Sequence, residues 1–361
     1  TMLTYIGWLD IDDLKKFRQF KSRTAGHPER HLTPGVEATT GPLGQGVGNA
    51  VGMAVAETIL RSQFGQDIVD HYTYVLHGDG DIQEPVAQGS IALAGHWGLG
   101  KLIAYYDAND AQISGKVSRS DSVNYSVLFD GLGWNVQEID GHDHSAMHFA
   151  IETAKVMDKP SIIIGKTVMA KGAATMEADH NTHGAPMAQD EIDQTKEKLG
   201  LPAKKFYVPT EVIDHFTHRF SDLTLEAKHW KEIFKKATKE TELKHKIAST
   251  ISGKIISEFE TPAFKSGDIL ATRKAFGAVL DSIAVSMPQL VGGSADLEPS
   301  NYTGNFARIY GDFQKNNKSG RNIPFGVREF PMAAIMNGLS LHLSLIHISE
   351  PTRQAEISYA V

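Results

Sequence analysis

The sequence contains no cysteine. This absence excludes disulfide frameworks, zinc fingers, iron–sulfur clusters and thiol nucleophiles together. No apolar run approaches the roughly 18 residues of a membrane-spanning helix. The 36 basic and 43 acidic side chains give a net charge of −7, without the basic footprint of a nucleic-acid binder. These absences favour a soluble cytoplasmic enzyme of small molecules, with neither nucleic acid nor membrane as partner.

The two ends of the chain differ from ordinary termini. The chain begins at Thr1 in the middle of an apolar pattern, so we expect a truncated start. At the other end, residues 343–353 resemble the translation of a sequencing-library adapter. We therefore expect residues 343–361 to be a non-native tail. The alternative is an ordinary helix and strand.

Short apolar runs alternate with longer amphipathic stretches between residues 40 and 190. The pattern predicts strands at 71–77, 102–106, 134–139 and 161–168, and helices at 49–60, 84–98 and 145–157. Strand, helix and strand at this spacing are typical of parallel βαβ units. We therefore predict an α/β fold, with a parallel sheet that helices cover on both faces.

A charged segment separates this region from a second one. Residues 189–266 are rich in Lys and Glu and predict a helical connector, with helices at 191–199, 210–220 and 225–247. A helix from 271 and a short strand at 289–291 then indicate the start of a second α/β domain. The predicted divisions are 1–190, 191–265, 266–342 and the tail 343–361.

Residues 33–48 form a glycine-rich run that enters an apolar helix. Backbone amides at such a helix start can hold a diphosphate. The run lacks the Gly-Lys-Ser/Thr of a P-loop, and no strand precedes it as in a dinucleotide loop. Taken alone, this run fits tight packing as well as it fits ligand binding.

Polar side chains follow two neighbouring predicted strands. Gly78-Asp79-Gly80 follows the first, and Asn109 follows the second, 30 positions after Asp79. A lone Gly-Asp-Gly is more often a simple turn. One βαβ unit, however, places both side chains at the carboxyl ends of adjacent strands, where open α/β sheets bind ligands. Carboxylate, amide and carbonyl oxygens suit Mg²⁺ or Ca²⁺, with diphosphate oxygens completing the shell.

This pattern resembles the metal and diphosphate motif of thiamine diphosphate enzymes. Further segments in the same order resemble the transketolase family: 26–29, 33–46, 179–186, 271–274, 292–297 with 299–301, and 326–330. The resemblance covers roughly residues 1–342 and is weakest in the connector. It implies a diphosphate-binding domain, a helical connector and a partial pyrimidine-binding domain.

The resemblance also implies a cofactor site. Asp79 and Asn109 would bind a divalent metal by their side chains, and Ala111 would bind it by its carbonyl. Mg²⁺ is the expected ion, with Ca²⁺ or another divalent ion possible. The implied contacts to thiamine diphosphate are Gly41, Pro42, Leu43, Gly80, Asn109, His183, Asp296 and Glu329. Asp81, Pro85 and Pro331 depart from the family's usual residues nearby.

Glu329 is the implied catalytic acid, placed against the aminopyrimidine ring of the cofactor. Such a glutamate must hold a proton, which requires apolar surroundings. Its neighbours in sequence supply apolar side chains: Phe325, Val327, Phe330 and Met332. The alternative is a surface ion pair between Arg328 and Glu329.

The remaining implied site residues face the sugar. His27 and His183 would act in catalysis and bind substrate, although a lone histidine is more often structural. Arg273 with Ser300 would hold the substrate phosphate, because a guanidinium binds two phosphate oxygens at once. The alternative for Arg273 is a solvated residue at a helix start.

The implied function is that of transketolase, in the pentose phosphate pathway. A homodimer would transfer a two-carbon ketol unit reversibly from a ketose phosphate to an aldose phosphate. The alternatives are a sibling enzyme, deoxyxylulose-phosphate or dihydroxyacetone synthase, or a non-catalytic transketolase-like binding protein. Because the second domain stops near residue 342, we expect the chain alone to be inactive and the helix at 332–341 to lack a cover.

Overall fold

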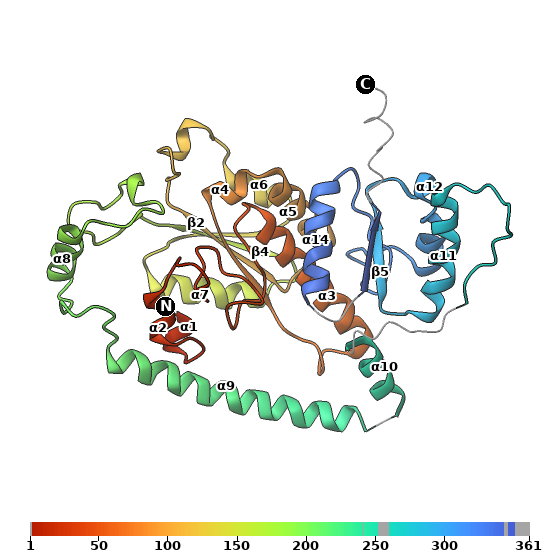
Figure 1. Cartoon of the computed structure of the whole chain (residues 1–361), viewed down its shortest axis with the longest axis horizontal. Helices are drawn as coiled ribbons and strands as arrows, with labels where there is room; N and C mark the ends of the chain where they lie inside the picture. The colour runs from red at the N-terminus through yellow and green to blue at the C-terminus, as the bar shows by residue number, and fades with distance from the viewer. Residues whose placement is uncertain (1, 240, 252–259, 343–345, 351–361) are drawn as a thin grey trace.

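A computed structural model describes residues 2–239, 241–251, 260–342 and 346–350. An α/β unit, the long helix α9 and a smaller second unit follow one another along the chain (Figure 1). The short helices of the first unit are α1 (Met2–Tyr5), α2 (Ile11–Lys15), α4 (Asp79–Gln83), η1 (Val117–Arg119) and η2 (His180–Thr182). None of the described helices is both long and apolar enough to cross a membrane.

The first unit is built on a parallel sheet. Its strands are β1 (Thr73–Gly78), β2 (Leu102–Ala108), β3 (Asn135–Asp140) and β4 (Ser161–Lys166), in the spatial order β1-β2-β4-β3. All three strand pairs are parallel, which confirms the predicted sheet. The register aligns Gly78 with Asp107, so the polar residues that follow β1 and β2 emerge at one edge.

Helices pack on both faces of this sheet. The main core contains α3 (Gln45–Phe64), α5 (Pro85–Trp97) and α6 (Tyr125–Gly131), with Trp97, Phe129 and Trp134 fully buried. A separate cluster joins α7 (His144–Lys155) to the strands through Ala150, Ala154, Ile103 and Ile163. Because both faces carry apolar side chains, the central strands β2 and β4 are rich in apolar residues, whereas the edge strand β3 is mostly polar.

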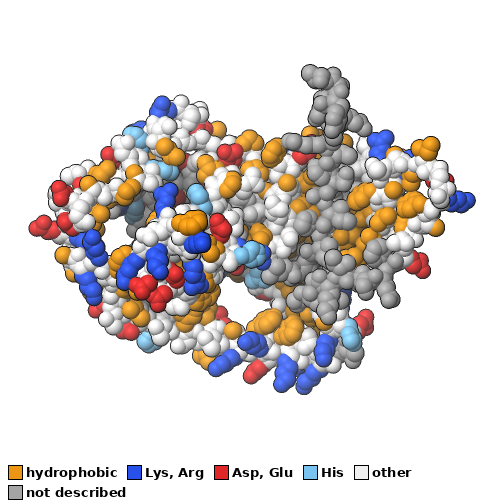
Figure 2. Space-filling model, in the orientation of Figure 1, with side chains coloured by type: hydrophobic (Ala, Val, Ile, Leu, Met, Phe, Trp, Pro, Cys, Tyr) orange, Lys and Arg blue, Asp and Glu red, His pale blue; other side chains and the backbone are white. Residues whose placement is uncertain are grey.

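The connector contains α8 (Gln189–Lys198), α9 (Thr210–Ala237) and α10 (Thr241–Ile251). The prediction of two helices at 210–220 and 225–247 is wrong, because α9 runs unbroken through that gap. Ser221 and Thr224 lie in the gap, and their hydroxyls bond carbonyls four residues earlier, as Ser and Thr commonly do inside a helix. Lys and Arg side chains gather along the outer side of α9 (Figure 2), as predicted for a solvated face.

The second unit contains α11 (Thr272–Ser286), β5 (Leu290–Ser294), α12 (Glu298–Asn301), α13 (Gly304–Tyr310), α14 (Glu329–Leu341) and β6 (Ile346–Glu350). β5 and β6 pair in parallel. β6 lies inside the predicted non-native tail, and the rest of that tail lies outside the described residues. The boundary at 343 therefore stays a prediction.

The expectation that the helix at 332–341 lacks a cover is wrong. α14 packs against α3 and α5 (Figure 1), and Met332, Ile335 and Leu339 are fully buried. Glycines make this contact possible: a Cβ at Gly52 would lie 2.0 Å from the Ile335 carbonyl oxygen. The backbones of the two helices therefore approach closely, and the first unit supplies the missing cover.

Candidate functional site

A cleft of about 420 Å³ opens at the edge of the sheet where β1 and β2 end. This volume lies within the range of small-molecule sites. Six residues implied by the sequence line the cleft: Leu43, Asp79, Gly80, Asn109, Ala111 and His183. They come from segments that are far apart in the chain. The parallel register of β1 and β2 brings the two polar motifs together, as predicted.

Asp79 is the buried carboxylate of the cleft. It begins α4 directly after β1, and its side chain is 6% exposed. One oxygen accepts a hydrogen bond from the Tyr106 hydroxyl at 2.6 Å, and the other accepts one from the Asn109 backbone N–H at 3.2 Å. Burial raises the pKa of Asp79, and these two hydrogen bonds oppose that rise. The contacts hold the carboxylate beside Asn109.

The turn after β2 orients Asn109. Its amide donates to Asp107 Oδ2 at 3.0 Å, and its Oδ1 accepts from the Ala111 N–H at 3.0 Å. Asp107 in turn accepts from the Thr167 hydroxyl. Asp110 has a positive φ of 56°, which reverses the chain between Asn109 and Ala111. Both predicted ligand residues therefore face one cleft.

The glycine-rich run packs beside the cleft. A Cβ at Gly80 would lie 3.1 Å from Leu43 Cδ1, and a Cβ at Gly41 would lie 3.1 Å from His27 Cγ. The structure thus places His27 beside Gly41 and Leu43 beside Gly80. Pro42 lies between them in the chain and is exposed. Small residues are needed here because the neighbouring segments approach within van der Waals contact.

Asp81 links this run to the end of β1. Its Oδ1 accepts from the Gly44 N–H at 2.9 Å, and its Oδ2 accepts from the Gly78 N–H at 3.0 Å. In the sequence Asp81 is visible only as a departure from the family pattern. Its position three residues after Gly78, at the start of α4, is the available signal, because a carboxylate there can cap backbone amides. Tyr106, the partner of Asp79, gives no such signal because it lies within an apolar strand.

The charged residues that line the cleft are Asp79, Asp81 and Asp107, and no Lys or Arg is among the described lining residues. A diphosphate alone would be repelled by these carboxylates, whereas a divalent cation would offset them. The donor types of Asp79, Asn109 and Ala111 fit Mg²⁺ or Ca²⁺. Within the described part of the chain, no three His, Asp or Glu side chains form a metal site by themselves. The three predicted metal ligands, Asp79, Asn109 and Ala111, would therefore need diphosphate oxygens to complete the coordination of a metal ion.

Glu329 lies at the first position of α14 and is exposed. Of the apolar residues beside it in sequence, Phe325 and Met332 are buried, but Val327 is 76% and Phe330 is 65% exposed. Among the described residues, Arg328 makes no ion pair with Glu329 and donates to the Phe325 carbonyl instead. The apolar residues beside Glu329 therefore form an open surface.

Three predicted residues lie in the second unit, outside the lining of the cleft. Arg273 is exposed near the start of α11, and Ser300 is exposed in α12, which packs against α11. Asp296 follows β5 with a positive φ of 67°. The cleft therefore brings together six predicted residues of the first unit. Its described lining does not include His27, Gly41 or Pro42, nor Glu329 and these three residues of the second unit.

Comparison with known proteins identifies both units. The family "Transketolase, thiamine diphosphate binding domain" matches residues 1–256, and "Transketolase, pyrimidine binding domain" matches residues 268–352. Transketolase 2 of Vibrio parahaemolyticus is 42% identical over 92% of this chain and 52% of its own length. The chain thus spans about half the length of the curated relatives it matches.

Solved structures with a similar fold point to the same family. Transketolase from Leishmania mexicana has a TM-score of 0.92 and 40% identity, over 96% of this chain and 53% of that one. Transketolase from Pichia stipitis in complex with sedoheptulose-7-phosphate has a TM-score of 0.89 and 36% identity, over 96% and 54%. Both the sequence families and the fold lead to one assignment. The chain belongs to the transketolase family.

Proposed function

We propose that this chain carries the cofactor-binding part of a transketolase. The observation that carries the proposal is the cleft in which Asp79, Asn109 and Ala111 meet beside Leu43 and Gly80. The proposed reaction is the reversible transfer of a two-carbon ketol unit from a ketose phosphate to an aldose phosphate. The Pichia stipitis relative in complex with sedoheptulose-7-phosphate supports this substrate class. The proposed setting is the pentose phosphate pathway in the cytoplasm.

Thiamine diphosphate, when bound, supplies a carbon nucleophile and an electron sink for breaking a carbon–carbon bond. In the proposal, Asp79, Asn109 and the Ala111 carbonyl hold Mg²⁺, or Ca²⁺ or another divalent ion. The cation offsets the acidic cleft so that a diphosphate can enter. The residues that would also contact the cofactor are Gly80 and His183, together with Gly41, Pro42, Leu43 and, from the second unit of a partner copy, Asp296.

The proposed acid is Glu329. Its surroundings in this chain are open, since Val327 and Phe330 are exposed. A second copy placed over this surface would exclude water and favour the protonated carboxyl group. We therefore propose a homodimer whose two copies complete each site, with domains at 1–190, 191–265 and 266–342. A single copy would lack activity.

The proposed sugar contacts are polar. Arg273 with Ser300 would hold the substrate phosphate, since the guanidinium fork binds two oxygens. His27 beside Gly41 and His183 in the cleft would act in catalysis and on the sugar hydroxyl groups. Sibling enzymes of the same cofactor, deoxyxylulose-phosphate or dihydroxyacetone synthase, would share the cleft and differ in these contacts.

Cofactor titration tests the proposal. Isothermal titration calorimetry should show that thiamine diphosphate binds the chain with Mg²⁺ and not with excess chelator. Asp79→Ala should abolish binding, because an oxygen ligand and its charge are lost. Asp67→Ala is the matched control, since Asp67 is exposed and does not line the cleft. Affinity of Asp79→Ala within a few-fold of wild type would overturn the proposed site.

A non-catalytic binding protein is the alternative from another class. It predicts that the wild-type chain binds no thiamine diphosphate under any of these conditions. Where binding is found, ketol transfer between a ketose phosphate and an aldose phosphate separates transketolase from its siblings.

A further inference from the structure

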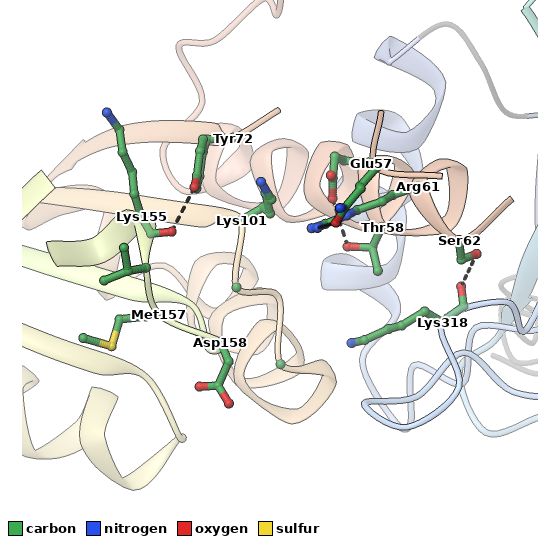
Figure 3. Close-up of a pocket in the computed structure, with 14 residues that line it drawn as sticks. Glu57, Thr58, Arg61, Ser62, Tyr72, Lys101, Lys155, Met157, Asp158 and Lys318 are labelled. Atoms are coloured by element: carbon green, nitrogen blue, oxygen red, sulfur yellow. Dashed lines mark hydrogen bonds between the residues drawn. The ribbon is translucent and has the colours of Figure 1, made fainter. Parts of the chain in front are cut away.

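A second cavity lies at the opposite end of the sheet. This amino-edge pocket has a volume of about 690 Å³ (Figure 3). Tyr72 precedes β1, Lys101 precedes β2 and Asp158 precedes β4, so the strands enter the sheet here. The far end of α3 and residue Lys318 complete the wall. The cofactor cleft lies where β1 and β2 end, so the two cavities are separate.

Glu57 is the buried acid of this pocket. It projects from α3 and is 1% exposed. The Thr58 hydroxyl donates to its Oε2 at 3.4 Å, while its Oε1 is buried and has no hydrogen-bond partner among the described residues. Leaving such an oxygen unsatisfied is costly, so it calls for a donor.

Three cations border the same space. Arg61 and Lys101 share one oxygen of Asp70, at 3.3 and 2.5 Å. Lys318 donates to the Trp97 carbonyl, and no described carboxylate lies within ion-pair distance of it.

Figure 3 shows Lys318 extending into the pocket, while the ammonium group of Lys155 points away from it. Lys155 instead pairs with Glu152 at 2.6 Å. Arg61 and Lys101 therefore share one carboxylate, and Lys318 has none. The lining also contains the acids Glu57 and Asp158, so the unmatched positive charge lies beside Asp70 and at Lys318, where an anion can neutralise it.

We propose that the amino-edge pocket binds a small phosphorylated polyol. Arg61, Lys101 and Lys318 bind its phosphate, and one of its hydroxyl groups donates to Glu57 Oε1. A bare anion would leave that oxygen without a donor, and an apolar molecule would leave Lys318 without an anionic partner. The volume fits a small metabolite. The site needs neither thiamine diphosphate nor a metal, so it does not depend on the proposed function.

Calorimetric titration of the 361-residue chain tests this site without cofactor or metal. The probes are glycerol 3-phosphate, inorganic phosphate and glycerol. We expect glycerol 3-phosphate to bind one to one, inorganic phosphate to bind more weakly and glycerol not to bind. Lys318→Met should weaken the binding of glycerol 3-phosphate at least about tenfold, because a charge-assisted contact is lost. Lys265→Met is the matched control, since exposed Lys265 lies shortly before α11 and outside the lining.

The same samples show where glycerol 3-phosphate binds and whether the variants are folded. Hydrogen exchange should show protection by glycerol 3-phosphate at 98–101 and 157–158, and not at 78–81. Arg61→Gln serves as a second variant if Lys318→Met loses its circular dichroism spectrum. Absence of millimolar binding would overturn the assignment. Equal losses of affinity in Lys318→Met and Lys265→Met, or protection at 78–81, would overturn it as well.

Discussion

The pH dependence of stability offers a sharp test of the buried Glu57. Its pKa is raised from 4.5 to about 7, chiefly by burial; Arg61 and Lys101 oppose the rise, Asp70 adds to it, and the Thr58 hydrogen bond opposes it. The folded chain therefore binds this proton more tightly than the unfolded chain does. Linkage then requires that the Glu57 contribution to stability falls as the pH rises from 4.5 to 7.

The size of the effect follows from those two pKa values. At about 1.4 kcal/mol for each pH unit, the rise corresponds to roughly 3 kcal/mol. Part of this change falls below pH 5, so about 2 kcal/mol of it lies between pH 5 and pH 8. Glu57→Gln removes the titration. Between pH 5 and pH 8, the free energy of unfolding of the variant should gain about 2 kcal/mol relative to wild type.

Urea denaturation at pH 5, 6, 7 and 8 measures this gain through the fluorescence of Trp97 and Trp134, which are buried in the same core as α3. Other titrating groups, such as buried His77, are present in both proteins and cancel in the difference. Glu152→Gln is the control, because Glu152 is exposed and paired with Lys155. A difference between Glu57→Gln and wild type that stays constant across this pH range would refute the reasoning.

Three further predictions concern packing and chemistry. Gly52→Ala should destabilise the chain by about 1–3 kcal/mol in the same urea assay, because its Cβ would meet the α14 backbone. Gly131→Ala, where the Cβ meets nothing within 4 Å, should be near neutral, and equal losses would disprove the α3–α14 contact. In a ketol-transfer assay of the assembled enzyme, Glu329→Gln should lower kcat about 10²–10⁴-fold, and near-normal turnover would reject its role. In the same assay, Arg273→Ala should raise KM for phosphorylated sugars, because a charge-assisted contact worth about 1.5–3 kcal/mol is lost. An equal rise in KM for unphosphorylated sugars would show that Arg273 has a structural role instead.

The sheet and the meeting of Asp79 with Asn109 were predictable because they depend on local patterns. Short strand-like runs marked the sheet, and parallel pairing then placed Asp79 and Asn109 at one edge. Leu43, Ala111 and His183 were expected only from the family resemblance. The roles of Tyr106 and Asp81 were not predictable, because each depends on a hydrogen bond to a residue whose position only the fold defines.

The second unit was harder to predict. The cover of α14 depends on glycines of α3 that lie almost three hundred residues earlier, and nothing near Met332 indicates them. The single helix α9 runs through Ser221 and Thr224, although their residue types favour a break. The surroundings of Glu329 depend on Val327 and Phe330, whose exposure a list of apolar residues cannot reveal.

The most direct test of the central claim is a crystal structure of this chain with thiamine diphosphate and Mg²⁺. We predict that the metal binds the side chains of Asp79 and Asn109 and the carbonyl of Ala111, with the diphosphate beside Leu43 and Gly80. A metal that contacts none of these three residues, or a cofactor bound away from the ends of β1 and β2, would contradict it.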